Sequence, residues 1–335
     1  EANISVKELD AVAIGRDPNA KYWNKVKFIA KHPFQSWHFV RDRFFNQKKV
    51  TSLEEEFAHY FDITAAEMHP KIHQVEHHRS HLASAFFSSP FEEAAVLSID
   101  GSGDFSTTML AIGKGNQFEV LDSIDFPHSL GIFYTAFTQW LGFPHYGDEY
   151  KVMGLAPYGE AKYTEQLMEL IHLLPNGLFE LNLKYFRDPS KGFVSYGENN
   201  IPQVPSLYGD ALVTKFGPAR PAAEPLSQFH KDMAASVQQA AERTIFHVLT
   251  HLQKRTGLQQ VCIAGGVAQN SVANGKITRN TGFKEVYIPS AGHDAGISMG
   301  AAQFVYHQTF QQPRVAPVYS AYTGAQFTNE DIEAL

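Results

Sequence analysis

The clearest pattern along the chain is a helical repeat of apolar residues in its C-terminal half. Between residues 227 and 252, apolar side chains recur at every third or fourth position, which is the spacing of one face of an α-helix. This spacing predicts one long helix, whose buried stripe consists of Phe229, Met233, Val237, Ala241, Ile245, Val248 and Leu252.

Short apolar runs predict the strands. Residues 94–99, 107–112 and 118–124 form three such runs, joined by short links that contain glycine. Links of this kind are typical of hairpins, so we expect three consecutive antiparallel strands. Beyond them, the pattern predicts strands over 260–264 and 285–288, and helices over 129–141, 270–280 and 291–304.

The first 90 residues carry a second, smaller set of elements. Short apolar runs alternate there with helical patterns, one of which opens with Thr51 followed three residues later by Glu54, a common helix start. The patterns predict strands over 11–15 and 72–76, and helices over 34–47, 51–61 and 77–87.

The order of these elements indicates an α/β fold with two lobes. Three strands, a helix, an insertion at about 174–226, a second helix and two strand–helix units resemble one full lobe of the actin-like ATPase (ASKHA) architecture. The insertion is rich in Pro, Gly and Asn, and we expect little regular structure in it. We assign 91–311 to this lobe II and 1–90 to the second half of an incomplete lobe I. Fold likeness alone does not give a function.

The last residues predict a connection to something further along the protein. Thr328 and Asp331 have the spacing of a capped helix start, and the sequence ends two turns later. We therefore expect 312–335 to be a linker toward another domain, and the chain to be a fragment of a longer protein.

Composition and charge narrow the function classes. The 335 residues are 44% hydrophobic and 19% charged, as expected of a chain with a packed core. The net charge of −7 argues against a dedicated binder of nucleic acid or membrane surfaces. The single cysteine, Cys262, excludes an internal disulfide and fits a reducing compartment, so we expect a cytoplasmic protein. The apolar runs are too short for a transmembrane helix.

Residues 21–49 depart locally from this charge balance. They hold eight Lys or Arg and one acid, Asp42, with aromatic residues among them. Such a mixture can bind nucleic acid. We favour the alternative, an amphipathic surface that packs its aromatic side chains inward, partly against parts of the protein outside this sequence.

His77 and His81 are the sharpest candidates for chemistry. They lie four residues apart on a predicted helix, so their side chains project from one face, one turn apart. Two imidazoles at this spacing can hold one metal ion. Such pairs also occur on protein surfaces, or in contact with metal ligands instead of with the metal itself. His78 would point elsewhere.

Asp100 ends a hydrophobic strand and opens the segment Asp100-Gly101-Ser102-Gly103-Asp104. A carboxylate at the tip of a strand can bind a metal. The two glycines allow a ligand to approach the backbone, and successive amides can form a nest for an anion. A glycine-rich hairpin, with aspartates as turn formers, is the alternative.

Three further positions follow predicted turns. Gly265, Gly266 and Asn270 lie between a strand and a helix, where free amides can bind phosphate or the chain can simply turn. Asp294, near the start of the last predicted helix, either caps that helix or points its carboxylate into the interlobe cleft. Lys151 is either a partner for a phosphate or carbonyl group or a solvent-exposed lysine beside a turn.

Together these segments resemble the NodU/tobramycin-type O-carbamoyltransferases. The resemblance rests on five motifs in the right order over residues 76–302, about two thirds of the chain, and is less clear in the first 75 residues and in 174–226. The motifs are EHHRSHLASAF, LSIDGSGDFSTT, SLGIFYTAFTQWLGF, EYKVMGLAPYG, and GGVAQNSVANGKI with a later aspartate before GISMGAA.

The resemblance implies a reaction and a set of cofactors. In this family a separate YrdC-like domain makes carbamoyladenylate from carbamoyl phosphate and ATP, and the larger domain passes the carbamoyl group to a hydroxyl of a sugar or antibiotic. One iron ion lies near the adenylate phosphate. By motif, its ligands here would be His77, His81, Asp100 and Asp294, and the nucleotide would contact Gly101, Ser102, Gly103, Gly265, Gly266, Asn270 and Lys151.

The resemblance also leaves gaps. The family's N-terminal strand and turn, with a Gly-His-Asp-like motif, and its YrdC-like domain are not in this sequence, so we do not expect the fragment to make carbamoyladenylate. Transfer also needs a general base. Asp104 is our candidate for that base, and Lys151 is our candidate for a second catalytic residue.

Two other functions stay open at this point. The family is related to the tRNA threonylcarbamoyl-transferase, which would make RNA the acceptor, but the net charge and the EYKVMGLAPYG segment favour a small-molecule hydroxyl acceptor. The chain could also be a non-catalytic, actin-like nucleotide-binding module.

Overall fold

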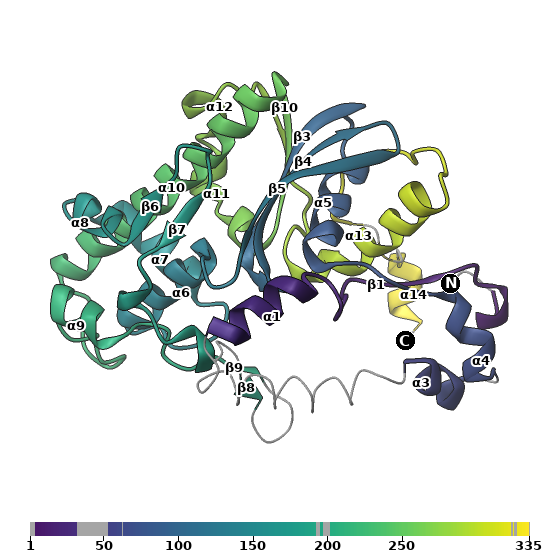
Figure 1. Ribbon diagram of the computed structural model, residues 1–335, viewed down its shortest axis with the longest axis horizontal. Helices are drawn as coiled ribbons and strands as arrows, with labels where there is room; N and C mark the ends of the chain where they lie inside the picture. Colours follow the sequence, from purple (N-terminus) through teal and green to yellow (C-terminus); the bar gives the residue numbers. More distant parts are fainter. Residues whose placement is uncertain are drawn as a thin grey trace.

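The computed structural model describes residues 4–31, 53–61, 63–191, 195–196, 202–322, 324 and 327–334. A five-stranded mixed sheet forms the centre of the molecule, with helices on both faces (Figure 1). The strand order is β11-β10-β3-β4-β5. The strands are β3 (Glu93–Gly103), β4 (Ser106–Lys114), β5 (Gln117–Asp125), β10 (Gln260–Ala264) and β11 (Glu285–Tyr287).

The sheet confirms the predicted hairpins. β3 pairs antiparallel with β4, and β4 with β5, whereas β10 runs parallel to both β3 and β11. Antiparallel neighbours need only short turns, while the parallel strands are connected through helices. The α/β class expected from the sequence is therefore correct.

Different helices pack against the two faces of β3. Its odd-numbered residues, such as Leu97, belong to the main core with α6 (Leu130–Trp140) and α10 (Gln228–Thr256). Its even-numbered residues, such as Val96, pack with α5 (His77–Ser88) instead. Side chains alternate along a strand, so residues 98 and 100 also face α5.

The long helix α10 follows its predicted apolar stripe. Of the seven predicted core positions, Met233, Val237, Ala241, Ile245, Val248 and Leu252 are buried. Phe229 at the first turn stays 38% exposed. It contacts the rings of Trp140 and Tyr163 at the edge of the core.

A smaller parallel pair of strands lies beside the sheet. β1 (Val12–Ile14) pairs with β2 (Ile72–Gln74), and α13 (Ile297–Gln303) packs against β1. The predicted elements 11–15, 51–61 and 72–76 are thus present, the second as α3 (Leu53–Tyr60). The predicted helix 34–47 lies outside the described residues. The structure adds α4 (Ala65–Met68).

The start of the basic and aromatic segment forms a helix that the patterns did not predict. In α1 (Tyr22–Lys31), Phe28 packs on the rings of Phe105 and Phe126. Inward packing is therefore confirmed for Phe28, whereas Trp23 is 71% exposed and its expected packing stays a prediction. The rest of the segment, beyond Lys31, lies outside the described residues.

The segment 174–226 is more regular than expected in its described part. The cause is its scattered aromatic residues: Phe179, Phe186 and Phe216 are buried in the main core, and they anchor short elements there. These elements and their neighbours are α7 (Glu149–Leu155), α8 (Thr164–Met168), β6 (Ile171–Leu173), β7 (Phe179–Leu181), β8 (Ser195–Tyr196), β9 (Pro202–Gln203) and α9 (Asp210–Phe216).

Two helices of the structure differ in extent from the predicted ones. The segment 270–280 is broken into α11 (Ser271–Asn274) and α12 (Ile277–Asn280), because α11 ends at Gly275. The helix predicted over 291–304 begins only with a 3₁₀ turn at Asp294–Gly296, followed by α13 and a π-helical turn, Phe304–Thr309.

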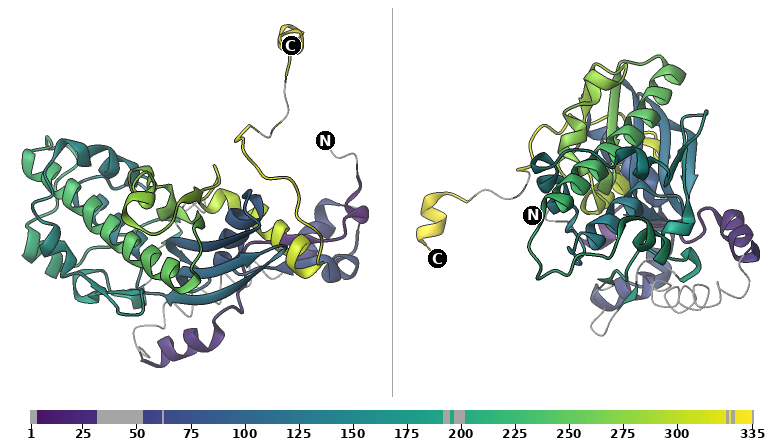
Figure 2. Two further views of the ribbon diagram at one scale, coloured as in Figure 1. Left: turned by 90° about the horizontal axis from the view of Figure 1, so that it is seen from above. Right: turned by 90° about the vertical axis from the view of Figure 1, so that its left-hand side faces the viewer.

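The first residues of the predicted linker lie against the C-terminal end of α5. Arg314 donates hydrogen bonds to the carbonyls of Phe86, Phe87, Ser89 and Phe91, which satisfies acceptors that the helix end leaves free. Farther on, α14 (Asn329–Glu333) starts with the predicted capping box and lies apart from the sheet (Figure 2). In the part of the chain that the structure describes, no helix is both long and apolar enough to cross a membrane.

Helices α5 and α13 touch closely at Gly300. A Cβ atom there would overlap the carbonyl of Ser80 on α5 and approach Ser84. Only glycine lets the two helices come this close, and both helices carry or adjoin candidate ligands. We expect Gly300→Ala to lower the free energy of unfolding by about 1–3 kcal/mol, as overpacked cores typically do.

The matched control is Gly154→Ala in α7, where a Cβ atom would meet no atom within 4 Å. Alanine favours helix over glycine by about 0.8–1.0 kcal/mol, so this variant should be neutral or more stable. Urea denaturation of both variants measures the difference. Equal stability of the two would contradict the close helix contact.

Candidate metal centre

The first turn of α5 is fixed by two carboxylates. Glu76 caps the helix by accepting a hydrogen bond from the Arg79 amide at 2.7 Å. Asp104 Oδ2 accepts from the His77 amide at 3.0 Å and from the Asp17 amide, after β1, at 2.7 Å. The sequence patterns did not assign Glu76 or Asp17 to the site. The position of Glu76 directly before an apolar helix was the available signal.

His77 and His81 lie one turn apart on α5, as their spacing predicted. Their Nε2 atoms face each other at 3.1 Å. Both side chains are buried, and His81 is fully so. His78 points away from this pair, because its Nδ1 lies 2.8 Å from the hydroxyl of Ser98. Burial lowers the pKa of His78 well below its usual value, so that ring is neutral.

Asp100 reaches the histidines from the sheet. The alternation of β3 points it toward α5, and its Oδ2 lies 3.1 Å from His77 Nε2 and 3.6 Å from His81 Nε2. Its other oxygen, Oδ1, accepts a hydrogen bond from the Gly266 amide at 2.9 Å. One carboxylate therefore joins the histidine pair to the glycine-containing turn after β10.

Asp294 completes the group from the 3₁₀ turn that precedes α13. Its Oδ1 lies 3.5 Å from His77 Nε2 and 3.4 Å from His81 Nε2. His293, not Asp294, is the N-cap of the 3₁₀ turn, so the carboxylate points to the site. Asp294 is 55% exposed while His81 is fully buried, so the group is open to solvent at Asp294.

These four side chains fit a metal ion. Their ligand atoms lie within 4.8 Å of one another, and no other group of three or more His, Cys, Asp or Glu in the described residues does so. Ligands about 2.1 Å from one ion lie about 3.0–3.4 Å apart at octahedral or tetrahedral angles. The observed separations of 3.1–3.6 Å between histidine nitrogens and their neighbours in the group are close to this range. Imidazole nitrogens and carboxylate oxygens are ligands that Fe(II), Zn(II) and Mn(II) accept.

Without a metal, a proton must balance the two carboxylates. Burial alone would lower the pKa of His81, but hydrogen bonds and charge from Asp100 and Asp294 outweigh it and raise that pKa to about 9. The Asp100 carboxyl loses solvation on burial, yet its two histidine neighbours hold its pKa well below the usual value. The site thus favours a positive charge at its centre.

The segment after Asp100 lies against two helix starts. Ser129, the N-cap of α6, donates its hydroxyl to the Asp100 carbonyl at 3.1 Å. Gly103 faces the His77 ring so closely that a Cβ atom would overlap it. Gly101 and Ser102 lie between these contacts, and Ser102 is exposed. Their predicted contact with a nucleotide stays a prediction.

The turn after β10 is anchored on both sides. The Gly265 amide donates to the carbonyl of Gly292, two residues before Asp294, at 2.7 Å. The side chain of Asn270 caps α11 and exchanges two hydrogen bonds with Gln238 of α10, both 2.9 Å. The patterns missed Gln238, which also accepts a hydrogen bond from Tyr134.

The two predicted catalytic residues are placed differently. Asp104 lies directly behind His77, with one oxygen occupied by two amides, and burial raises its pKa. Lys151, on α7, pairs with Asp148 at 2.6 Å, and this hydrogen bond raises its pKa. No contact of Lys151 with the four candidate ligands is found in the described residues. Both catalytic roles stay predictions.

Comparison with known proteins shows to which family this chain belongs. The model of the family described as "Carbamoyltransferase N-terminus" matches residues 1–303, nine tenths of the chain. This chain belongs to the carbamoyltransferase family. The resemblance expected from the five motifs is therefore confirmed.

The relatives of this carbamoyltransferase chain are longer proteins. It is 38% identical over 344 residues to the uncharacterized protein sll1178 of Synechocystis, covering 99% of this chain and 54% of the relative. It is 36% identical to the nodulation protein NolNO of Sinorhizobium fredii and 35% to NolO of Bradyrhizobium diazoefficiens, covering 76% and 78% of this chain. It spans 34% and 43% of those two proteins, so it covers about half of its relatives or less.

Solved structures give a weaker likeness. The chain matches HypF of T. kodakarensis with a TM-score of 0.37 and 17% identity, covering 73% of this chain and 39% of HypF. It matches a full-length, phosphate- and nucleotide-bound HypF with a TM-score of 0.38 and 15% identity, covering 76% and 44%.

His81→Ala should abolish metal binding, because it removes one of four converging ligand atoms. Loss of even an outer-shell partner typically costs about 10–100-fold in affinity, so we expect more than about 100-fold here. The control is His78→Ala, which removes a neighbouring buried imidazole outside the group. Equilibrium dialysis with elemental analysis measures bound metal, and near-UV circular dichroism verifies folding. Equal metal content in folded His81→Ala and parent would refute the ligand assignment.

Metal binding should depend on pH through His81. Its pKa of about 9 means that the metal-free ring is protonated at pH 7, whereas a metal binds only the neutral ring. Stabilisation from the charged ring is present below pH 6.5 and is lost as pH rises through 9. Apparent metal affinity should rise over the same interval, with proton release on binding. Calorimetry in two buffers of different ionisation enthalpy tests this, and a flat pH profile would contradict it.

Proposed function

We propose that this chain is the transfer core of an O-carbamoyltransferase. The observation that carries the proposal is the convergence of His77, His81, Asp100 and Asp294 beside the turn at Gly266, in a chain of the carbamoyltransferase family. The mixed sheet with helices on both faces supports an actin-like ATPase fold, in which the first lobe supplies His77 and His81 and the second lobe supplies Asp100 and Asp294.

The proposed donor is carbamoyladenylate, made from carbamoyl phosphate and ATP by a YrdC-like domain elsewhere in the longer protein. An acceptor hydroxyl oxygen forms a bond to the carbamoyl carbon, and the bond from that carbon to the phosphate oxygen breaks. AMP leaves with the electron pair, and the hydroxyl proton passes to a base. Asp104 is our candidate for the base, through the oxygen that the two amides leave free.

The four ligands would hold the metal, for which the family resemblance favours Fe(II). A bound divalent ion supplies Lewis-acid stabilisation of charge that develops on the carbonyl and phosphate oxygens. Asp100 orients the site, since it links the ligand group to the Gly266 amide on the nucleotide side. The exposed edge at Asp294 leaves room for substrates to enter.

The proposed partners are a small-molecule acceptor and the YrdC-like domain of the same protein. A sugar, an antibiotic or a similar natural product supplies the hydroxyl. The net charge of −7 favours such an acceptor over RNA. A reducing, cytoplasmic setting fits the one buried thiol, Cys262.

The full-length protein should carbamoylate a hydroxyl compound. Given ATP, carbamoyl phosphate and a panel of polyols, it should produce a compound in which one hydrogen is replaced by a carbamoyl group, detected by mass spectrometry. His81→Ala in the full-length protein should lose this product while still forming carbamoyladenylate. The contradicting result is a folded, metal-loaded protein that forms carbamoyladenylate and carbamoylates RNA, but carbamoylates none of the polyols.

A further inference from the structure

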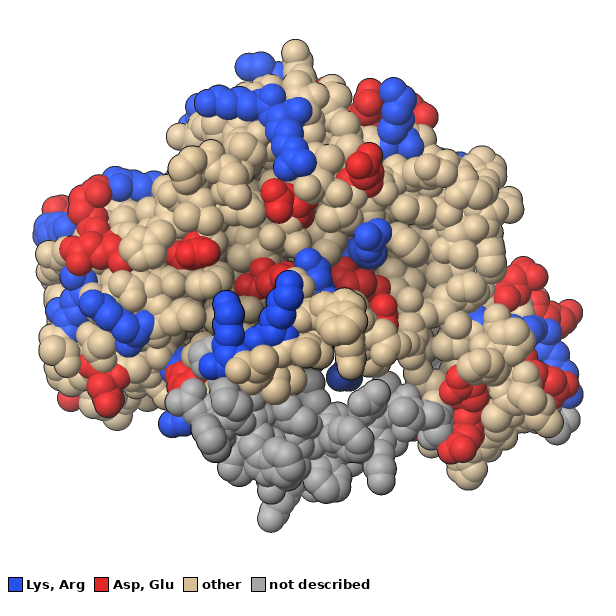
Figure 3. All heavy atoms as spheres, viewed as in Figure 1, with Lys and Arg blue, Asp and Glu red and all other residues tan. Residues whose placement is uncertain are grey.

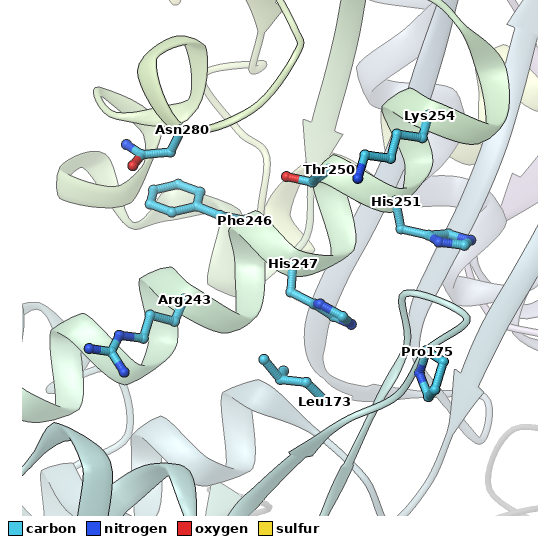
Figure 4. A pocket seen from close by; sticks show the side chains of 9 residues that line it. All are labelled: Leu173, Pro175, Arg243, Phe246, His247, Thr250, His251, Lys254 and Asn280. Carbon is cyan, nitrogen blue, oxygen red and sulfur yellow. The ribbon is translucent and has the colours of Figure 1, made fainter.

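A separate groove lies along the outer side of α10. It is shallow and open to solvent, with a volume of about 510 Å³. It runs between α10, the hairpin of β6 and β7, and the end of α12, and none of its residues belongs to the candidate metal centre (Figure 4). Its lining consists of Leu173, Pro175, Arg243, Phe246, His247, Thr250, His251, Lys254 and Asn280.

The groove is basic in an acidic protein. Arg243, His247, His251 and Lys254 succeed one another by about one turn each along α10, and the lining contains no carboxylate. Figure 3 shows basic side chains gathered at the top of the molecule, over α12 and the adjacent end of α10. Arg243 at one end pairs with Glu165 at 2.6 Å, whereas Lys254 at the other end has no ion-pair partner among the described residues. The unbalanced charge therefore lies at the Lys254 end.

The β6–β7 hairpin holds both histidine rings in place. His247 Nε2 donates a hydrogen bond to the Leu174 carbonyl at 3.0 Å. The His251 ring packs on Gly177, whose φ of +81° and lack of a Cβ atom make room for it. In Figure 4, both rings point to the hairpin side, while Lys254 extends back along the helix toward Thr250. The two histidine rings are thus fixed against the hairpin, which leaves Lys254 and Thr250 on the open side of the groove.

We propose that this groove binds a small molecule through a phosphate group. Lys254 and the neighbouring Thr250 hydroxyl offer donors to the phosphate oxygens. The half-buried face of Phe246, together with Leu173 and Pro175, offers apolar contact to the rest of the ligand.

Other ligand classes fit this groove less well. The histidine pair could attract a metal ion, but the neighbouring Lys254 and Arg243 charges disfavour a cation. The basic stripe spans only about 16 Å along the helix, one groove's length, which favours a small phosphate compound over RNA.

The test uses pyrophosphate as the probe and isothermal titration calorimetry at low salt. Parent protein should bind it at one site, and Lys254→Gln should weaken binding by about fivefold or more. The matched control is Arg255→Gln, which removes an equal charge from the next residue, where the side chain faces Asp122 and the Leu121 carbonyl instead of the groove. This control should bind like the parent. Both residues are exposed, so neither variant is expected to unfold.

Two results would overturn the proposal. The first is a parent protein that does not bind pyrophosphate, or binding that Lys254→Gln and Arg255→Gln weaken equally. Equal weakening would mean that pyrophosphate is attracted by the general charge of this surface and not by the groove. The second is tighter binding of a ten-nucleotide RNA that Lys254→Gln abolishes, which would make the groove an RNA surface. Metal content measured in the same variants separates this site from the metal centre, because Lys254→Gln should leave bound metal unchanged.

Discussion

The buried carboxylate of Asp100 constrains the rest of this structure. A carboxylate that leaves water needs positive or hydrogen-bonding partners, since an unpaired buried charge is far too costly. Asp100 meets this need with the imidazoles of His77 and His81 at one oxygen and the Gly266 amide at the other. Three separate elements, α5, β3 and the turn after β10, must therefore stay in register. The close contact at Gly300 holds α13, and with it Asp294, on the same side.

The sequence predicted an element of the fold best where a single local rule, such as helical periodicity, determines that element. The stripe of α10 and the hairpins of β3, β4 and β5 follow from periodicity and glycine-bearing links, and both are present. The pairing of His77 with His81 follows from helix geometry. The convergence of Asp100 and Asp294 on them required the family resemblance, because no local pattern indicates which distant strand or turn lies opposite a helix face.

The sequence was less informative where tertiary packing overrides local pattern. The late start of α13 follows a turn whose Gly292 carbonyl accepts a hydrogen bond from the Gly265 amide, and periodicity does not record such contacts. The segment 174–226 was judged by its Pro and Gly content, but its buried aromatics decide its structure. Partners such as Gln238 and Asp17 are found only when the chain is folded, since each acts across a long sequence separation.

The proposed function depends on a cation shared by four side chains. Anomalous diffraction at the iron edge, on crystals of the metal-loaded protein, locates that cation directly. We predict one peak within about 2.0–2.4 Å of Nε2 of His77 and His81 and of carboxylate oxygens of Asp100 and Asp294. A peak elsewhere, or bound iron without a peak among these four side chains, would contradict the account.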